Sequence, residues 1–168
     1  MENKKPIKDE DGYYTVQLGT LIGTPVILDA GTPYEKRIKY DAKTTMAALK
    51  SFGRRVSEGY GCGEARLDKL EDETVQDYIS RITTKDVTRL AFIIKEMRLV
   101  KVNKNGVFKV EADIKPIGPF GDVLKTCLDD PEKEVIFGLR ALVKPSKRST
   151  SKVEVNDVIN IISYDWIK

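Results

Sequence analysis

The sequence predicts an α+β domain built on a mostly antiparallel sheet or small barrel, flanked by two or three helices. Most segments with strand-like composition lie close to one another along the chain, and only a few helical patterns interrupt them. A length of 168 residues fits one domain with a sizeable core. We therefore expect a single domain over residues 13–168, preceded by a charged N-terminal arm, residues 1–12, that is mobile or bound to a partner.

Two strands and a long helix are predicted in the first part of the chain. Residues 13–18 and 20–28 are rich in β-branched and aromatic side chains and are broken by glycines. Asp41 stands where a helix N-cap belongs, and Gly59 is a suitable C′ residue for the same helix. The positions that recur between them at three- and four-residue steps, and so predict one apolar face, are Met46, Leu49, Phe52 and Val56.

The rest of the chain is predicted to hold a hairpin, two short helices and two further strands. Residues 87–102 fit both a helical and an alternating pattern, but 103–106 are typical of a turn and 107–115 alternate cleanly. At least the end of the first segment is therefore expected to be a strand. The other predicted elements are helices over 75–82 and 122–128 and strands over 134–143 and 153–167.

The chain contains no histidine, and this absence restricts its chemistry strongly. Histidine is the usual general base near neutral pH, so hydrolases that use a Ser–His or Cys–His pair are excluded, as are metal sites with imidazole ligands. Cys62 and Cys127 are too few for a disulfide framework and lack metal-ligand spacing. We expect a reducing compartment, no metal and no cofactor.

The charge balance and hydropathy pattern predict an ordinary soluble protein. The formal net charge is only +3, whereas a nucleic-acid-binding protein is expected to carry a clustered basic face. No apolar run approaches the roughly 20 residues that span a bilayer, and the first residues are too charged for a signal peptide. We therefore expect no membrane association.

Two kinds of catalytic site do not require histidine and are therefore still possible. A reactive Cys62 would have to be activated by a lysine, an arginine or a helix terminus. A Ser–Lys dyad also needs no histidine, and Ser146–Lys147 and Ser151–Lys152 are adjacent pairs of that kind. The loop that contains them is basic, and its charged residues are Lys144, Lys147, Arg148 and Lys152. These residues could contact phosphates or a partner protein, or the loop could simply be solvated.

In order along the chain, these features resemble the prohead assembly proteases of tailed bacteriophages, which are relatives in fold of the herpesvirus assemblins. That family has a Gly-Glu-Leu-Asn-His-Pro segment with the catalytic histidine after its helix, and residues 63–68 (GEARLD) stand there. Its strand with Gly-Val-Ser-Ser-Arg-Gly carries the nucleophilic serine, and residues 136–141 (IFGLRA) stand there. Its closing apolar strand resembles residues 160–167 (NIISYDWI).

The resemblance implies that the catalytic residues have been replaced. Leu67 stands at the histidine position, and Gly138 and Leu139 stand at the two serine positions. The best-matched points, which would be structural remnants of the site, are Gly63, Glu64, Arg140 and Asp165. We expect Arg140 to have a buried partner such as Glu64 or Asp165.

The expected function is that of a catalytically inactive relative used as a structural protein of a phage particle, assembled in the host cytoplasm. It could be a capsid decoration or cement protein, a head-completion component or a scaffold component. The expected partners are capsid or other virion proteins and further copies of the chain, with only weak support for nucleic acid. The alternatives are an active protease that uses Cys62 or a Ser–Lys pair, and a host-directed binding module.

Overall fold

The structure, a computed structural model, describes residues 6–22, 26–28, 37–65, 72–101, 107–145 and 153–167. Nine strands in this part of the chain form two sheets. The first sheet has the order β1-β2-β7-β6-β5, with every neighbouring pair antiparallel. Its strands are β1 (Ile7–Lys8), β2 (Tyr14–Ile22), β5 (Cys62–Glu64), β6 (Leu90–Lys101) and β7 (Val107–Pro116).

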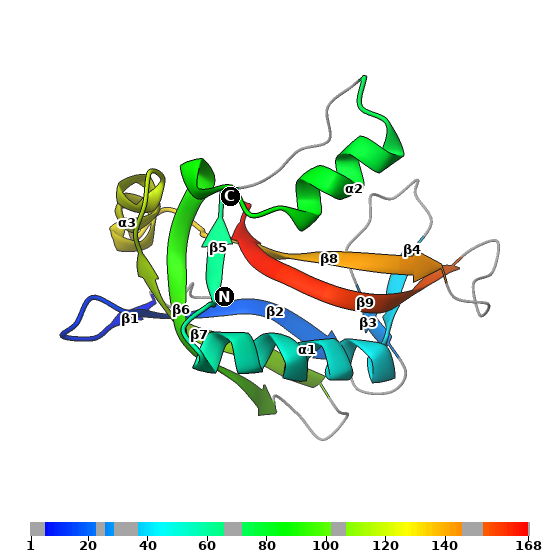
Figure 1. Cartoon of the computed structure of the whole chain (residues 1–168). Coiled ribbons are helices and arrows are strands. Elements are labelled where there is room, and N and C mark those ends of the chain that lie inside the picture. Colours follow the sequence, from blue (N-terminus) through cyan, green and yellow to red (C-terminus); the bar gives the residue numbers. More distant parts are fainter. Residues whose placement is uncertain are drawn as a thin grey trace.

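The second sheet has the order β3-β4-β9-β8, and its central pair, β4 and β9, is parallel. Its strands are β3 (Val26–Leu28), β4 (Arg37–Asp41), β8 (Phe137–Pro145) and β9 (Val153–Trp166). The helices in the described segments are α1 (Ala42–Ser57), α2 (Val75–Thr83) and α3 (Gly121–Asp129), with a 3-10 turn, η1 (Val87–Arg89), before β6. Figure 1 shows α1 below the two sheets, α2 above β8 and β9, and α3 at the far end of the first sheet. The predicted α+β class, mostly antiparallel with three helices, is confirmed.

α1 begins and ends as the sequence predicts. The Asp41 side chain accepts a hydrogen bond from the Thr44 backbone N–H at 3.0 Å. At the other end, Gly59 has a φ of 88° and its N–H donates to the Val56 carbonyl, while the Tyr60 N–H donates to the Arg55 carbonyl. This pair of bonds is a Schellman motif, which requires the left-handed conformation that glycine adopts without strain.

The predicted apolar face of α1 is wrong at one position. Met46 is 38% exposed, and the buried side chains are Thr45, Ala48, Leu49, Phe52 and Val56. The helical repeat allows the residue either three or four positions before Leu49 to face the core, and these residues are Met46 and Thr45. Thr45 takes the inward position because its hydroxyl is satisfied locally, donating to the Asp41 carbonyl at 2.6 Å.

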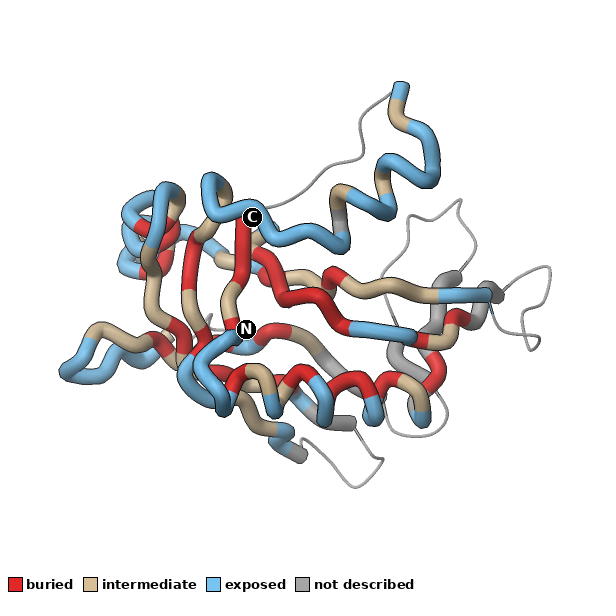
Figure 2. Tube along the Cα trace, in the orientation of Figure 1, coloured by how far each residue is buried: buried red, intermediate tan, exposed pale blue. Residues whose placement is uncertain are grey.

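One hydrophobic core lies between the sheets and α1, and both sheets contribute to it. Figure 2 shows buried (red) segments in the strands of both sheets and at intervals along α1. Phe52 of α1 contacts Tyr164 of β9, and Phe92 of β6 meets Phe137 of β8 edge to face, with ring centroids 5.3 Å apart. These aromatic contacts join the two sheets through the core.

Several predicted boundaries shift in the structure. Residues 14–22 form one strand with a bulge between Gln17 and Gly19, rather than ending at residue 18. The ambiguous segment 87–102 contains both patterns, a 3-10 turn followed by a strand. Ile7 and Lys8, placed in the arm by sequence, pair with β2 of the same chain. The predicted turn 103–106 lies outside the described residues.

Candidate functional site

Three of the residues singled out by the sequence meet where β5, β8 and β9 come together. The Arg140 Nη2 of β8 lies 2.9 Å from the Glu64 Oε2 of β5, and its Nε lies 3.2 Å from the Asp165 Oδ2 of β9. All three side chains are at most 7% exposed. The expected buried partner of Arg140 is therefore present, and both candidates fill that role.

A fourth side chain, Ser163 of β9, completes this cluster. Its hydroxyl donates to the Asp165 Oδ1 at 2.6 Å and accepts from the Arg140 Nε at 3.1 Å. The sequence analysis did not select Ser163. The available signal was its position two residues before Asp165, because alternate residues of a strand share one face. We call Glu64, Arg140, Ser163 and Asp165 the buried cluster.

Backbone contacts hold the buried cluster in place. The Glu64 N–H donates to the Asp165 Oδ1 at 3.2 Å, and the Asp86 N–H donates to the Glu64 Oε2 at 3.2 Å. Arg140 lies directly opposite Ser163 in the β8–β9 register, and the residue after Glu64, Ala65, forms a parallel bridge to Trp166. The cluster thus fixes the edge of the first sheet against the second.

The electrostatic balance of the buried cluster is one guanidinium against two carboxyl groups. Burial raises the pKa of Asp165, although Arg140, the Ser163 hydroxyl and the Glu64 backbone N–H act in the opposite direction, and the charge of Glu64 raises it further. Two atoms in the cluster, the Glu64 Oε1 and the Arg140 Nη1, are buried without a hydrogen-bond partner.

Gly63 permits the close approach of β5 to its neighbours. A Cβ at this position would lie 2.0 Å from the Phe92 Cζ and 2.4 Å from the Tyr164 backbone oxygen. Neither atom belongs to a flexible chain end, since Phe92 is fully buried and the oxygen is backbone. Any side chain at residue 63 would push β5 away from β9 and separate Glu64 from the other members of the buried cluster.

Gly138 and Leu139, which the resemblance places at the serine positions, are neighbours on β8 and face opposite sides of the strand. Leu139 packs against the hydrophobic core. Gly138 lies on the face shared with Arg140, opposite Asp165 in the strand register. A Cβ at Gly138 would meet the Ile167 Cδ1 at 1.9 Å, so the Ile167 side chain occupies the space where a side chain at this position would begin. Leu67 lies outside the described residues.

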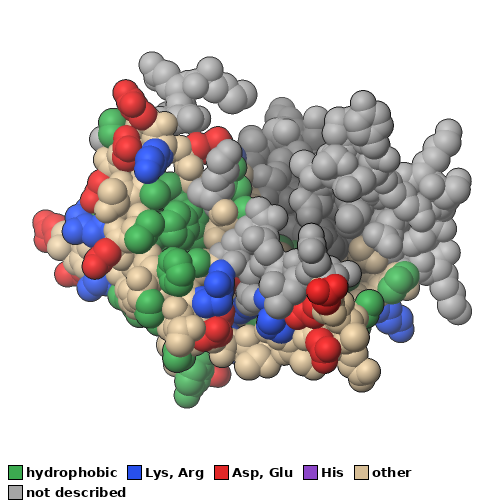
Figure 3. All heavy atoms as spheres, turned by 90° about the horizontal axis from the view of Figure 1, so that it is seen from above, with side chains coloured by type: hydrophobic (Ala, Val, Ile, Leu, Met, Phe, Trp, Pro, Cys, Tyr) green, Lys and Arg blue, Asp and Glu red, His purple; other side chains and the backbone are tan. Residues whose placement is uncertain are grey.

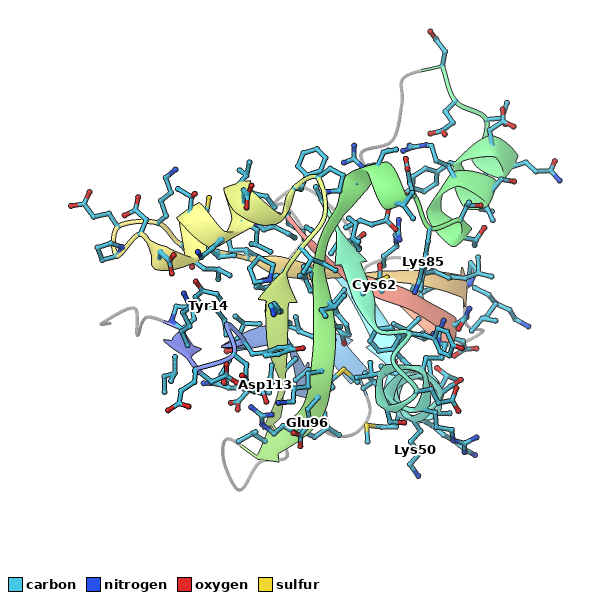
Figure 4. All side chains as sticks on the ribbon, turned by 60° about the vertical axis from the view of Figure 1, so that its left-hand side comes forward. Tyr14, Lys50, Cys62, Lys85, Glu96 and Asp113 are labelled. Atoms are coloured by element: carbon cyan, nitrogen blue, oxygen red, sulfur yellow. The ribbon has the colours of Figure 1, made fainter. Side chains whose placement is uncertain are left out.

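Cys62 has a lysine neighbour that the sequence analysis did not name. The Lys85 ammonium lies 3.4 Å from the half-buried Cys62 Sγ and 3.2 Å from the Tyr60 carbonyl oxygen. Figure 4 shows Lys85 and Cys62 close together beside β5. The signal could not be read from sequence, because the two residues are brought together by the fold across 23 positions.

The basic loop is only partly described. Lys144 is exposed at the end of β8, whereas Lys147, Arg148 and Lys152 and both Ser–Lys pairs lie outside the described residues. On the face shown in Figure 3, blue and red side chains are interspersed over the part of the surface that is coloured. Among the residues with described positions, no group of three or more His, Cys, Asp or Glu side chains could hold a metal ion. No helix in the same part of the chain is long and apolar enough to cross a membrane.

A family model describes nearly the whole chain. The model of the peptidase S80 family matches residues 2–168. The chain belongs to the peptidase S80 family. The resemblance to the phage prohead proteases is thereby confirmed at the level of the family.

The fold matches that of a solved member of the phage proteases. The structure of the bacteriophage T4 capsid assembly protease, gp21, aligns with a TM-score of 0.57 and 14% sequence identity, covering 98% of this chain and 90% of that one. At this identity the match shows a shared fold. No curated protein matches the chain in a sequence search.

Proposed function

We propose that this chain is a non-catalytic member of the peptidase S80 family that serves as a structural or interaction protein of a phage particle. The observation that carries the proposal is the absence of any histidine from the sequence, together with Gly138 and Leu139 at the serine positions. A Ser–His peptidase loses its nucleophile or its base when either residue is missing, and here both positions have changed.

The geometry of the remaining residues supports a structural role. Arg140, Glu64 and Asp165 bind one another rather than facing an open surface, and each side chain is at most 7% exposed. A substrate could not reach them without separating β5 from β8 and β9.

The phage setting of the proposal comes from the shared fold. The T4 protein is a capsid assembly protease, and a relative that keeps the surfaces of such a protein can act on capsid proteins without cutting them. We accordingly propose capsid or other virion proteins as partners and the virion as the site of action, following assembly in the host cytoplasm. Decoration, cement, head-completion and scaffold roles are all compatible with this fold.

One observation favours a second candidate, a protease with a cysteine nucleophile. Lys85 is 3.4 Å from Cys62, and a lysine is the kind of group that can activate a thiol where histidine is missing. Lys85 is exposed, however, and its ammonium already donates to the Tyr60 carbonyl. This candidate is therefore the weaker of the two.

A cleavage assay separates the two candidates. Purified protein would be incubated with the capsid and scaffold proteins of its own particle, and the products analysed by mass spectrometry. We expect no cleavage by the wild type or by the Cys62→Ala and Lys85→Ala variants. Cleavage that disappears in Cys62→Ala would establish the cysteine protease, and cleavage that survives in both variants would refute both candidates.

The composition of purified particles tests the structural role directly. We expect the chain in a fixed ratio to capsid protein when virions are analysed by quantitative mass spectrometry. Its absence both from mature virions and from proheads would contradict the proposal, whatever the result of the cleavage assay.

A further inference from the structure

α1 carries a row of positive charge along its outer surface. Lys43, Lys50 and Arg54 are all exposed and lie on one line of the helix, because they follow one another at steps of seven and four residues. Ala47 lies between them on the same line, and the partly exposed Met46 lies beside it. We call Lys43, Ala47, Lys50 and Arg54 the basic crest. Figure 4 shows Lys50 pointing away from the body of the protein.

The cations of the basic crest are unpaired within the described residues, and the nearest carboxylate along the helix is the C-cap residue Glu58, four residues after Arg54. The sequence of α1 contains no Asp or Glu, and none of the three cations takes part in an ion pair in this part of the chain. Arg54 also differs from the other arginines with described side chains. Each of the others donates a side-chain hydrogen bond. These arginines are Arg55, Arg81, Arg89, Arg98 and Arg140.

A complementary feature lies in the turn between β1 and β2. Asp9, Glu10 and Asp11 are consecutive and exposed, and we call them the acidic tip. The turn is well defined, since the Asp9 Oδ1 accepts from the backbone N–H groups of both Asp11 and Tyr13 at 2.9 Å. Ile7, 76% exposed, stands next to it, and the neighbouring Lys8 is directed to the Tyr14 ring.

The acidic tip cannot reach the basic crest of its own chain. Figures 1 and 4 show the β1–β2 turn projecting from one side of the molecule and α1 lying apart from it. Figure 2 shows that both features are exposed. Their charges are nevertheless opposite and similar in number, and each has one exposed apolar side chain beside it, Ile7 at the tip and Met46 at the crest.

We propose that the acidic tip of one copy docks on the basic crest of a second copy. The two surfaces are different, so the contact is head-to-tail, and each copy keeps one free tip and one free crest for further copies. Such a contact builds a ring or an open array rather than an isolated pair. The inference is independent of whether the chain cleaves peptide bonds.

The contact is expected to be weak and sensitive to salt. Exposed ion pairs contribute little individually and are screened at physiological ionic strength. In an assembled particle many copies are held close together, and repeated weak contacts then become effective through high local concentration. We therefore expect self-association in dilute buffer at low ionic strength and high protein concentration, and its loss on adding salt.

The test is a charge swap followed by sedimentation velocity. The crest variant carries Lys50→Glu and Arg54→Glu, and the tip variant carries Glu10→Lys and Asp11→Lys, which leaves the structural Asp9 unchanged. We expect each variant alone to associate at least about tenfold more weakly than the wild type. An equimolar mixture of the two should associate again, because each reversed surface then meets a partner of opposite charge.

A matched control has the same change in charge elsewhere. Lys109→Glu with Lys125→Glu alters two exposed lysines on β7 and α3, and we expect its self-association to match that of the wild type. Failure of the mixture to associate, or equal loss in the control, would overturn the proposal. A second result would also overturn it: the wild type stays monomeric but binds a short DNA duplex, and the crest variant does not bind the duplex. The partner of the basic crest would then be nucleic acid.

Discussion

Arg140 holds together strands from both sheets, and its contribution depends on its two carboxylate partners. Bringing a guanidinium and two carboxyl groups out of water is costly, so the buried cluster adds little net stability compared with apolar residues of the same shape. Removing one member is different, because the groups that remain stay buried without a counter-charge. The buried cluster therefore acts mainly to specify how β5 meets β8 and β9.

Replacing Arg140 with alanine is expected to destabilise the protein by about 3–5 kcal/mol, since Glu64 and Asp165 would lose their counter-charge in a buried position. Urea unfolding followed by circular dichroism measures this change. Arg98→Ala is the control, because Arg98 also binds two carboxylates but its side chain is 33% exposed, and its loss should cost only about 1 kcal/mol. Similar stability of Arg140→Ala and wild type would show that the buried cluster has no structural role.

Asp165 is expected to make stability fall as the pH rises. Burial raises its pKa above the usual 3.8, so the folded protein binds this proton more tightly than the unfolded chain does. The resulting stabilisation is complete below the unfolded pKa and is lost as the pH rises through the folded pKa. Asp165→Asn cannot titrate, and its free energy of unfolding should therefore improve relative to wild type as the pH rises above 3.8.

Asp113 provides a control with the opposite sign. Hydrogen bonds from Arg98 lower its pKa, so its stabilisation is present above the unfolded value of 3.8 and is lost on acidification through the lower folded value. Asp113→Asn should therefore lose stability relative to wild type as the pH rises. Parallel behaviour of the two variants would contradict the assignment for Asp165.

The residues of the buried cluster show what sequence can and cannot predict at this scale. Arg140, Glu64 and Asp165 were selected because a resemblance to a family aligned them, and the ion pair followed from their opposite charges. Ser163 was missed because its only sequence signal, a position two residues before Asp165 on the same strand face, does not by itself distinguish it from other strand residues. Lys85 was missed because its proximity to Cys62 depends on the fold.

At the scale of single elements, β5 is held in place by a glycine. Gly63→Ala would bring a methyl group within 2.4 Å of the Tyr164 backbone oxygen, and we expect a loss of about 3 kcal/mol or more in thermal or urea unfolding. Gly53→Ala is the matched control in α1. Its new methyl would lie 4.0 Å from the Met97 Cε, an ordinary contact, and alanine should stabilise the helix by about 0.5–1 kcal/mol.

β8 allows a direct test of the contact between Gly138 and Ile167. Gly138→Ser should destabilise the protein by no more than about 1 kcal/mol, because its Cβ would meet the Ile167 Cδ1 at 1.9 Å, and this atom is the end of a flexible side chain that is 38% exposed and can rotate. Ile167→Ala in the same chain removes the obstruction, and the double variant should recover most of the loss. A double-mutant cycle measures this coupling, and additive effects would show that Ile167 does not occupy the position.

The helices and strands were predictable wherever local patterns were unambiguous. The N-cap, the glycine C-cap of α1 and the alternation in β7 are local signals, and each element is present. Met46 was misplaced because the helical repeat alone does not choose between two adjacent inward positions. The segment 87–102 stayed ambiguous because it contains two structures, a 3-10 turn and a strand.

For the molecule as a whole, a shared core predicts cooperative unfolding. Both sheets and α1 contribute to one cluster of buried side chains, so neither sheet should persist without the other. Trp166, the single tryptophan, reports on the second sheet, while circular dichroism reports on all elements. We expect the two urea transitions to coincide, and separate midpoints would indicate two independently folding units.

The arrangement of the sheets could not be predicted from the sequence. The α+β class follows from the order and number of elements, which are local properties. The parallel pairing of β4 with β9 depends instead on segments distant in the chain, and no local pattern marks it. The same holds for the meeting of β5 with β9, which creates the buried cluster.

The pairing of β4 with β9 also has a kinetic consequence. Arg37 pairs with Val153, so forming the centre of the second sheet brings together residues that are 116 positions apart in the chain. Such non-local pairings slow folding, because the entropy of a long loop is lost before the contacts of the sheet are gained. The first sheet, whose β6 and β7 are neighbours in sequence, can form earlier. Until β9 is in place, the inner faces of β6 and β7 remain uncovered, and in that interval the chain is most exposed to aggregation.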